Sequence, residues 1–187
     1  MPAYISMLRG INVSGQKLIK MDALKNLYES LDFEEVITYV QSGNVVFRAE
    51  ACDAKTLAQK LSVKIKEVFD FDVEVIVKTV DDFHLIVDSN PFKSDFDKET
   101  FGIYITFLSS VPDKIDRTAL EIKRSEDEEV VIFNDVVYLN CPCGYGKTKL
   151  TNNFFESKLK VVATTRNWKT VNALLGISLR KYQQNGE

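Results

Sequence analysis

The order of apolar and polar segments predicts an α+β protein built from two consecutive β-α-β-β-α-β units. Short β-branched runs alternate with longer segments of helical periodicity, and this order of elements occurs twice. A polar stretch broken by Pro91 separates the two halves. The same order defines the ferredoxin-like fold, or α/β plait, so we expect two antiparallel sheets with helices on one face of each.

The first unit is expected to comprise residues 1–89. It opens with a buried strand at residues 3–8, followed by a loop at 9–20 that contains Gly10 and Gly15. The following elements are a helix through residues 24–31, a strand at 36–40, a turn at 41–44, a strand at 45–48, a helix from Asp53 to Phe69, a strand at 73–77 and a connecting helix at 80–87.

The second unit is expected to comprise residues 90–187 and to end in a C-terminal helix. A polar linker at 89–100 precedes its first strand. Its elements are a strand at 101–108, a helix at 113–123, a hairpin of strands 130–133 and 136–140 around Asn134-Asp135, a helix at 151–159, a short strand at 161–163 and a helix at 168–179. Residues 164–168 are interpreted as the start of that last helix, with a threonine as its cap.

This topology gathers polar loops into two clusters. Right-handed crossovers and hairpins place the loop at 9–20 beside the turn at 41–44, and the loop at 141–150 beside residues 164–169. The segment 9–20 has three basic residues and no acid, and residues 141–187 have eight basic residues against two acids. In a chain of net charge −3, both clusters are therefore expected to be positive.

An anionic or phosphorylated small molecule is the ligand that these clusters favour. We expect it to bind in one basic cleft between the two units, because a shared cleft would focus both fields on one ligand. The candidate ligand-binding residues are Arg9, Asn12, Gln41, Ser42, Asn44, Lys149, Arg166 and Asn167.

The sequence offers no convincing catalytic group, so catalytic residues are unknown and no cofactor or metal is expected. Gly144–Thr148 resembles the end of a phosphate-binding loop, but Cys141 stands where that motif requires glycine. Cys141 and Cys143 have too few companion ligands for a tetrahedral metal site. The single histidine, His84, is interpreted as a surface or packing residue.

Two other functions stay open: RNA binding, and a protein-interaction module without catalytic activity. The plait is a common RNA-binding scaffold, but the strands lack the expected pair of aromatic residues. No apolar run is long enough to span a membrane, and we expect no signal peptide before the first strand. Three cysteines form no disulfide framework, which favours a cytoplasmic location.

Four motifs in order resemble a bacterial family, the domain-of-unknown-function family sixteen-ninety-seven. They are residues 8–13 (LRGINV), 41–45 (QSGNV), 144–150 (GYGKTKL) and 163–171 (ATTRNWKTV). The resemblance implies two α/β plaits and brings no established activity, so it supplies no catalytic residues. Ser14 stands where that family usually has glycine, and the Cys141-Pro142-Cys143 segment also departs from the family pattern.

Overall fold

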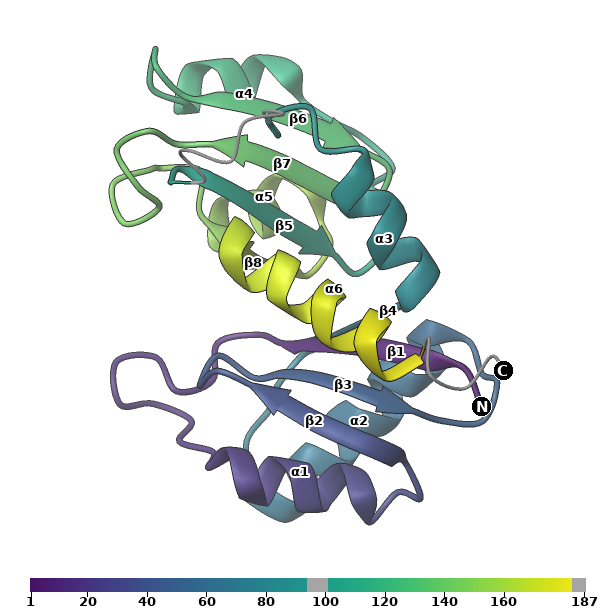
Figure 1. Cartoon of the computed structure of the whole chain (residues 1–187). Coiled ribbons are helices and arrows are strands. Elements are labelled where there is room, and N and C mark those ends of the chain that lie inside the picture. Colours follow the sequence, from purple (N-terminus) through teal and green to yellow (C-terminus); the bar gives the residue numbers. More distant parts are fainter. Residues whose placement is uncertain (94–100, 183–187) are drawn as a thin grey trace. The chain divides into compact units, whose positions relative to one another are not determined.

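The computed structural model describes residues 1–93 and 101–182 (Figure 1). The first seven elements are β1 (Ala3–Leu8), α1 (Met21–Glu29), β2 (Glu34–Tyr39), β3 (Asn44–Arg48), α2 (Ala54–Phe69), β4 (Val75–Thr79) and α3 (Val80–Asp88). The remaining elements are β5 (Ile103–Leu108), α4 (Arg117–Lys123), β6 (Glu129–Phe133), β7 (Val136–Asn140), α5 (Asn152–Leu159), β8 (Ala163–Asn167) and α6 (Trp168–Tyr182).

The strands form two four-stranded antiparallel sheets, with orders β2-β3-β1-β4 and β6-β7-β5-β8. In each sheet the first strand of the unit lies between the third and the fourth and pairs antiparallel with both. This is the strand order of the ferredoxin-like fold. The predicted fold class, two consecutive plaits with antiparallel sheets, is confirmed.

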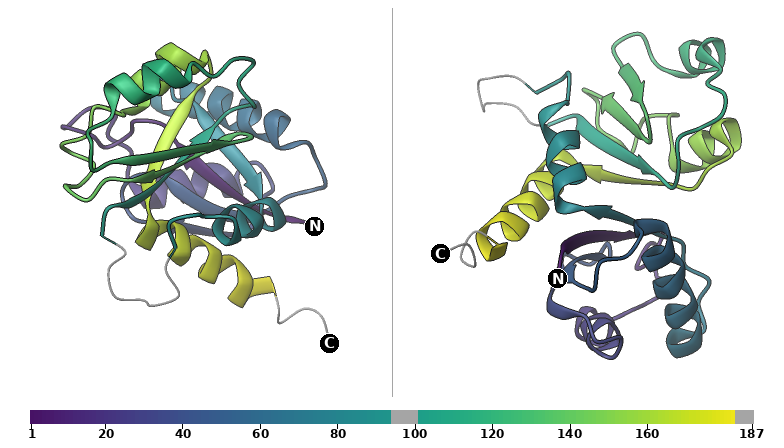
Figure 2. Two further views of the ribbon diagram at one scale, coloured as in Figure 1. Left: turned by 90° about the horizontal axis from the view of Figure 1, so that it is seen from above. Right: turned by 90° about the vertical axis from the view of Figure 1, so that its right-hand side faces the viewer.

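Helices α1 and α2 cover one face of the first sheet (Figures 1 and 2). Apolar residues at helical spacing, including Leu24 in α1 and Leu61 in α2, pack on alternate residues of the strands. The rings of Phe33 and Phe47 stack at 4.8 Å between centroids within this core. Asp53 begins α2 by accepting a hydrogen bond from the backbone N–H of Thr56 at 3.0 Å, as predicted for a helix cap.

The second sheet has helices on both faces. On one face Leu120 of α4 and Phe155 of α5 pack with Leu139 of β7 in a buried cluster. Tyr138 points to the opposite face, where its hydroxyl donates to the Ile86 carbonyl at 3.0 Å. The last turn of α3 therefore lies on that face, so helices on one face alone were the wrong expectation for this sheet.

The chain divides into two compact units, Met1–Leu85 with Ala173–Glu187, and Ile86–Asn172. We call them the first and the second unit. Helices α3 and α6 each have residues in both, so the expected division between residues 89 and 90 stays a prediction. Part of the expected linker, residues 94–100, lies outside the described residues. Within residues 1–93 and 101–182, no helix combines the length and apolarity needed to cross a membrane.

Candidate functional site

The first candidate site is a corner of the first unit, formed by the loop at residues 9–20 and the turn at residues 40–43. We call it the first corner. The backbone N–H of Leu8 donates to the carbonyl of Gly43 at 2.9 Å, which joins the end of β1 to the turn. The turn glycine has φ +74°, and a Cβ on it would lie 2.6 Å from Cδ1 of Ile11. The close approach of loop and turn therefore requires glycine at position 43.

Asn12 holds the loop and the turn together. Its side-chain amide donates to the carbonyls of Ile19 at 2.9 Å and Gln41 at 2.8 Å. Its Oδ1 accepts from the backbone N–H of Ile19 at 2.9 Å. Both amide hydrogens thus have acceptors in the protein, so Asn12 braces the corner more than it faces a ligand.

Asn44 has a similar role at the other side of the turn. It is fully buried at the start of β3, and its amide donates to the Tyr39 carbonyl at 3.0 Å and to Oγ of Ser42 at 2.9 Å. Ser42 and Gln41 themselves lie on the surface, while Arg9 is half-buried where β1 ends. The structure therefore brings together all five candidate residues of the first unit: Asn12 and Asn44 brace the corner, Gln41 and Ser42 are exposed, and Arg9 is partly exposed.

The backbone of the first corner is strained at four residues. Asn12, Ser14, Lys17 and Val40 have positive φ, a conformation that costs a residue with a Cβ. Gly10, Gly15 and Gly43 also have positive φ, which glycine adopts without strain. Val40 is the costliest of the four, because a β-branched residue at φ 51° crowds its own backbone. Such conformations persist where surrounding contacts fix them, and they concentrate at sites that bind ligands.

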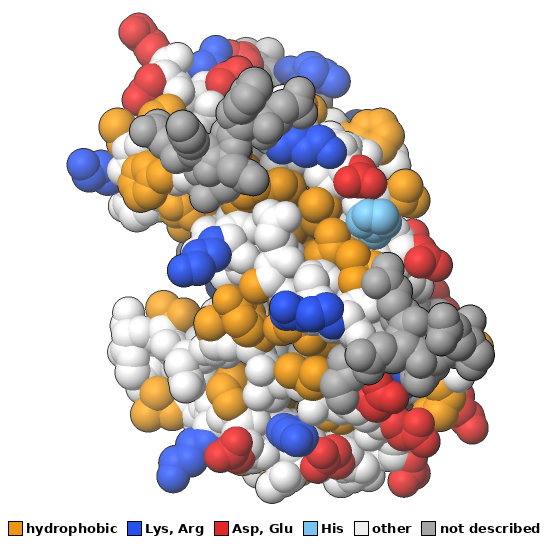
Figure 3. Space-filling model, in the orientation of Figure 1, with side chains coloured by type: hydrophobic (Ala, Val, Ile, Leu, Met, Phe, Trp, Pro, Cys, Tyr) orange, Lys and Arg blue, Asp and Glu red, His pale blue; other side chains and the backbone are white. Residues whose placement is uncertain are grey.

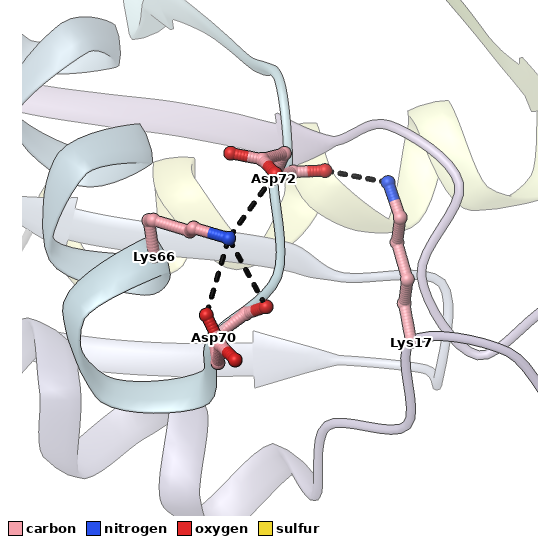
Figure 4. A network of polar contacts seen from close by, with 4 residues as sticks. All are labelled: Lys17, Lys66, Asp70 and Asp72. Carbon is pink, nitrogen blue, oxygen red and sulfur yellow. Dashed lines mark hydrogen bonds and ion pairs between the residues drawn. The ribbon is translucent and has the colours of Figure 1, made fainter.

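Acidic residues also lie at this end of the first sheet, in the segment 70–74 before β4. The backbone N–H of Arg9 donates to the Glu74 carbonyl at 2.8 Å, and the Lys17 ammonium donates to the Asp72 carbonyl (Figure 4). Lys66 bridges Oδ1 of Asp70 at 3.1 Å and Oδ2 of Asp72 at 3.2 Å. Hydrogen bonds to Asp70 and then Asp72 raise the pKa of Lys66.

These acids change the electrostatics that were expected from the loop alone. Three basic side chains in residues 9–20 lie at the same sheet end as three acidic side chains in residues 70–74. The first corner therefore carries charges of both signs and is not a uniformly positive surface. The sequence held a signal for this arrangement, since the plait order places the segment before the fourth strand at the same sheet end as the first loop.

The second unit has a matching corner, formed by the loop at residues 109–116 and the turn at Asn134-Asp135. We call it the second corner. The backbone N–H of Leu108 donates to the Asp135 carbonyl at 2.9 Å, the same bond that Leu8 makes to Gly43. Within residues 109–116 and 134–135, Asn134 alone has positive φ. The fold thus makes this corner with a shorter loop and almost no strain.

The second predicted cluster lies at the other end of the second sheet. The loop at 141–150 contacts β8 through Tyr145, whose hydroxyl donates to Oγ1 of Thr165 at 3.2 Å. Thr165 in turn donates to Oδ1 of Asn152 at 2.6 Å and lies 2.7 Å from Oγ1 of Thr106. Lys149 is exposed in the same loop. The loop therefore packs on the α5 face of the sheet.

Arg166 lies in a strand, and the interpretation of residues 164–168 as a helix start is wrong. Residues 163–167 pair with β5, where Arg166 lies opposite Ile105. Arg166 is 7% exposed, and its Nη1 donates to Oγ1 of Thr164 at 2.8 Å. The cap of α6 is Asn167, whose Oδ1 accepts from the backbone N–H of Thr170 at 2.8 Å.

The strand β8 continues past the expected end at residue 163 because residues 164–167 pair with β5. The β-branched Thr164 and Thr165 suit a strand by propensity, whereas Arg166 is a strand residue through its pairing with β5. Alternate residues of β8 point to opposite faces, so Arg166 lies on the face away from Thr165 and Tyr145. The structure does not bring Arg166 and Tyr145 to the same face of the sheet. A single cleft formed by both predicted clusters stays a prediction, because the clusters belong to separate units.

The cysteines are three free thiols. Cys141 is fully buried, and burial, followed by the nearby Glu128 carboxylate, raises its pKa to about 11. It is therefore a protonated, unreactive thiol at neutral pH. Cys143 is exposed, and its Sγ lies 3.5 Å from Oδ2 of Asp127. Among the residues that the structure describes, no group of three or more His, Cys, Asp or Glu side chains could hold a metal ion.

Comparison with known proteins supplies a family and a fold. Residues 1–138 match the model of a family described as "Protein of unknown function (DUF1697)". No curated protein matches the sequence. The conserved bacterial protein SP0830 from Streptococcus pneumoniae has a similar structure, with a TM-score of 0.64 and 22% sequence identity over 95% of this chain and 98% of that chain. At this identity, the similarity shows the fold.

Proposed function

We propose that this chain, which belongs to the DUF1697 family of proteins of unknown function, binds an anionic or phosphorylated small molecule at the first corner. The match of residues 1–138 to the family model confirms the family that the sequence motifs predicted. The family description names no activity, so the proposal rests on the geometry of the site.

The observation that carries the proposal is the difference between the two corners. Both contain the same backbone hydrogen bond, from Leu8 to Gly43 and from Leu108 to Asp135. The plait therefore does not require the longer loop, the strained backbone or the bracing amides of the first corner. Backbone strain that the fold does not require is typical of ligand-binding sites, because it keeps the binding surface in one conformation before the ligand arrives.

The chemistry of the corner favours an anionic group that receives directed hydrogen bonds. Gln41 and Ser42 are exposed and Arg9 is partly exposed, and their amide, hydroxyl and guanidinium groups can all donate to a phosphate or carboxylate oxygen. The acidic residues of the segment 70–74 reduce the net positive charge at this end of the first sheet. Selectivity for a compact anion is therefore expected to come from the fork geometry of the arginine.

The ligand is also expected to have an apolar part. The loop of the first corner exposes Val13 and Leu18, at 58% and 66% of their surface, and the turn exposes Val40. Three exposed apolar side chains around polar donors suit a molecule with both characters. Lys149, Arg166 and Asn167 would join the site only if both clusters face one cleft, so the proposed site at the first corner does not include them.

A protein-interaction module is the second candidate, and the exposed apolar side chains favour it over RNA binding. Stacking on RNA bases needs exposed aromatic rings on the central strands. Tyr4, Phe47, Phe107 and Tyr138 on those strands are all 2% exposed or less, and the partly exposed Tyr104 packs against the ring of Tyr145. An enzyme has no direct support: Ser42 accepts a hydrogen bond from Asn44, and the single histidine lies on the surface of α3 (Figure 3).

We also propose a cytoplasmic location. Two of the three free cysteines, Cys52 and Cys143, have exposed thiols. Exposed unpaired thiols suit a reducing compartment. Fractionation of a bacterial host that expresses the untagged chain, followed by immunodetection, would test the proposal; recovery in the envelope fraction would contradict it.

The proposed ligand is tested by a thermal-shift screen of the full chain against sugar phosphates, nucleotides and dicarboxylates, with calorimetric titration of each hit. A ligand that binds the folded state raises the melting temperature. Arg9→Ala is expected to weaken binding by about tenfold or more, because it removes a charge-assisted contact. Arg117→Ala, an exposed arginine of the second unit, is the matched control and should bind as the wild type does.

Equal affinity of the Arg9→Ala variant and the wild type would exclude the first corner as the anion site. Turnover of any hit, followed by phosphate release or mass spectrometry, would show an enzyme; saturable binding without product would show a binding protein.

A further inference from the structure

Strand β6 is an edge strand of the second sheet, because β7 is its single neighbour in the strand order. Its register with β7 runs without a shift from Glu129 to Phe133. In antiparallel pairing, every second residue of an edge strand directs its N–H and C=O away from the sheet. Such a row of backbone groups can pair with an added strand.

A groove lies beside this edge, between β6 and α4. It has a volume of ≈ 190 Å³ and is lined by Ile115, Arg117, Leu120, Glu121 and residues 130–132. A cavity of about 150 Å³ holds a benzene molecule, so this groove has room for one apolar side chain of an added segment. Ile115 is 37% exposed and Val131 is 39% exposed, which leaves apolar surface open next to the edge.

The corresponding edge strand of the first sheet, β2, is protected. Its register is broken between Glu34 and Ile37, and Glu35 has φ 50°. A bulge and charged residues are two devices that keep an edge from pairing with another chain. Residues 129–133 contain no lysine, proline or bulge, and Phe133 is 59% exposed. Beyond its first residue, Glu129, the β6 edge thus lacks the protection that β2 has.

The surroundings of the groove are acidic. Residues 113–135 contain eight acids and four bases, a net charge of −4, while the whole chain has a net charge of −3. Four of these acids, residues 126–129, precede or begin β6. A strand added antiparallel to β6 would have its C-terminal end beside them, so lysine or arginine is favoured at that end of the segment.

We propose that β6 and its groove bind an extended segment of a partner protein by strand addition. The segment pairs antiparallel with β6, places one apolar side chain in the groove next to Ile115, and carries basic residues at its C-terminal end. This interaction surface is separate from the first corner, and its test does not depend on an anionic ligand.

The experiment uses the immobilised full chain to select from a displayed library of random ten-residue segments. The most enriched segment is then synthesised and titrated by fluorescence anisotropy. We expect enriched segments to alternate apolar residues and to end in lysine or arginine. Ile115→Arg should raise the dissociation constant at least tenfold, whereas Ile122→Arg adds the same charge on an exposed α4 residue outside the groove and should change it less than twofold.

Asp127→Lys should raise the dissociation constant several-fold, because it reverses one charge beside the basic end of the segment. Circular dichroism of each variant establishes that the fold is kept. Failure of the selection to enrich any segment, or equal binding by the Ile115→Arg and wild-type chains, would overturn the proposal. Sedimentation that shows a dimer dissolved by Ile115→Arg would assign the edge to a second copy of this chain and would also overturn it.

Discussion

The two corners of this molecule solve the same structural problem with different amounts of chain. Each joins the first loop of a plait to its hairpin turn through one backbone hydrogen bond of 2.9 Å. The second corner does so with residues 109–116 and a two-residue turn. The first corner uses residues 9–20, seven positive-φ residues and the side-chain amides of Asn12 and Asn44.

The difference separates what the fold needs from what has been added to it. Because the second corner shows that a short, relaxed connection is sufficient, the conformational cost of the first corner is not explained by folding. Each non-glycine residue held in a sparsely populated conformation costs about 1–3 kcal/mol, so Asn12, Ser14, Lys17 and Val40 together are a large fraction of a domain's stability. We therefore expect the first corner to serve binding and the second corner to serve only the fold.

The largest expected effect is on the turn of the first corner. Gly43→Ala places a Cβ 2.6 Å from Ile11 and 2.9 Å from Leu8 at φ +74°, so it should lower the free energy of unfolding by about 2–4 kcal/mol. Gly15→Ala, at φ +73° with open space around it, is the matched control and should lower it by about 1 kcal/mol. Urea unfolding measures both, and equal effects would show that loop and turn do not pack as described.

A second prediction concerns pH and the ionisable groups in the two cores. Burial raises the pKa of Tyr28 in the first unit, that of Tyr138 to about 12, and that of Cys141 to about 11. The unfolded chain releases these protons at lower pH than the folded chain, so the free energy of unfolding should fall as pH rises above about 9. By pH 11 the thiol alone should account for about 2 kcal/mol.

Urea unfolding at pH 8 to 11 measures this dependence, and Cys141→Ala is the control. In the variant the decline should begin only near pH 10, where ordinary tyrosines ionise, and by pH 11 it should be smaller than in the wild type by the contribution of the thiol. An identical decline in both chains would show that the Cys141 thiol keeps its ordinary pKa.

A smaller effect is expected from the brace of the first corner. Asn12→Ala removes hydrogen bonds to Ile19 and Gln41 and should cost about 1–2 kcal/mol, with faster amide hydrogen exchange in residues 9–20. Asn134 in the second corner has a left-handed backbone conformation that asparagine tolerates better than alanine, and it forms no comparable brace. Asn134→Ala should therefore lower the free energy of unfolding by about 0.5–1 kcal/mol. If the Asn134 variant proves the more damaging, the two corners do not differ as proposed.

The fold could be predicted from the sequence because its signals are local. Helical spacing of residues such as Leu24 and Leu61, and turn chemistry at Gly43 and Asn134, fixed the order of elements that both sheets confirm. Plait topology then placed Arg9, Asn12 and residues 41–44 at one sheet end, as the structure has them.

What the sequence did not predict depends on contacts between distant segments. Arg166 was assigned to a helix start because its place in β8 depends on pairing with Ile105, sixty-one residues earlier. Asn12 was expected to face a ligand, but a side-chain amide that binds two carbonyls cannot be distinguished in sequence from one that faces a ligand. Asp70 and Asp72 lie beside the loop at residues 9–20 only across the sheet end, a proximity that the distribution of charge along the chain does not show.

The central claim is that the first corner, and not the second, binds the anionic ligand. Its most direct test is a two-dimensional NMR titration of the full chain with the anion that raises the melting temperature most in the screen. The account predicts saturable shifts of the amides in residues 9–20 and 40–43, while the amides of residues 109–116 and 134–135 stay in place. Shifts of equal size in both corners, or shifts confined to the second unit, would contradict it.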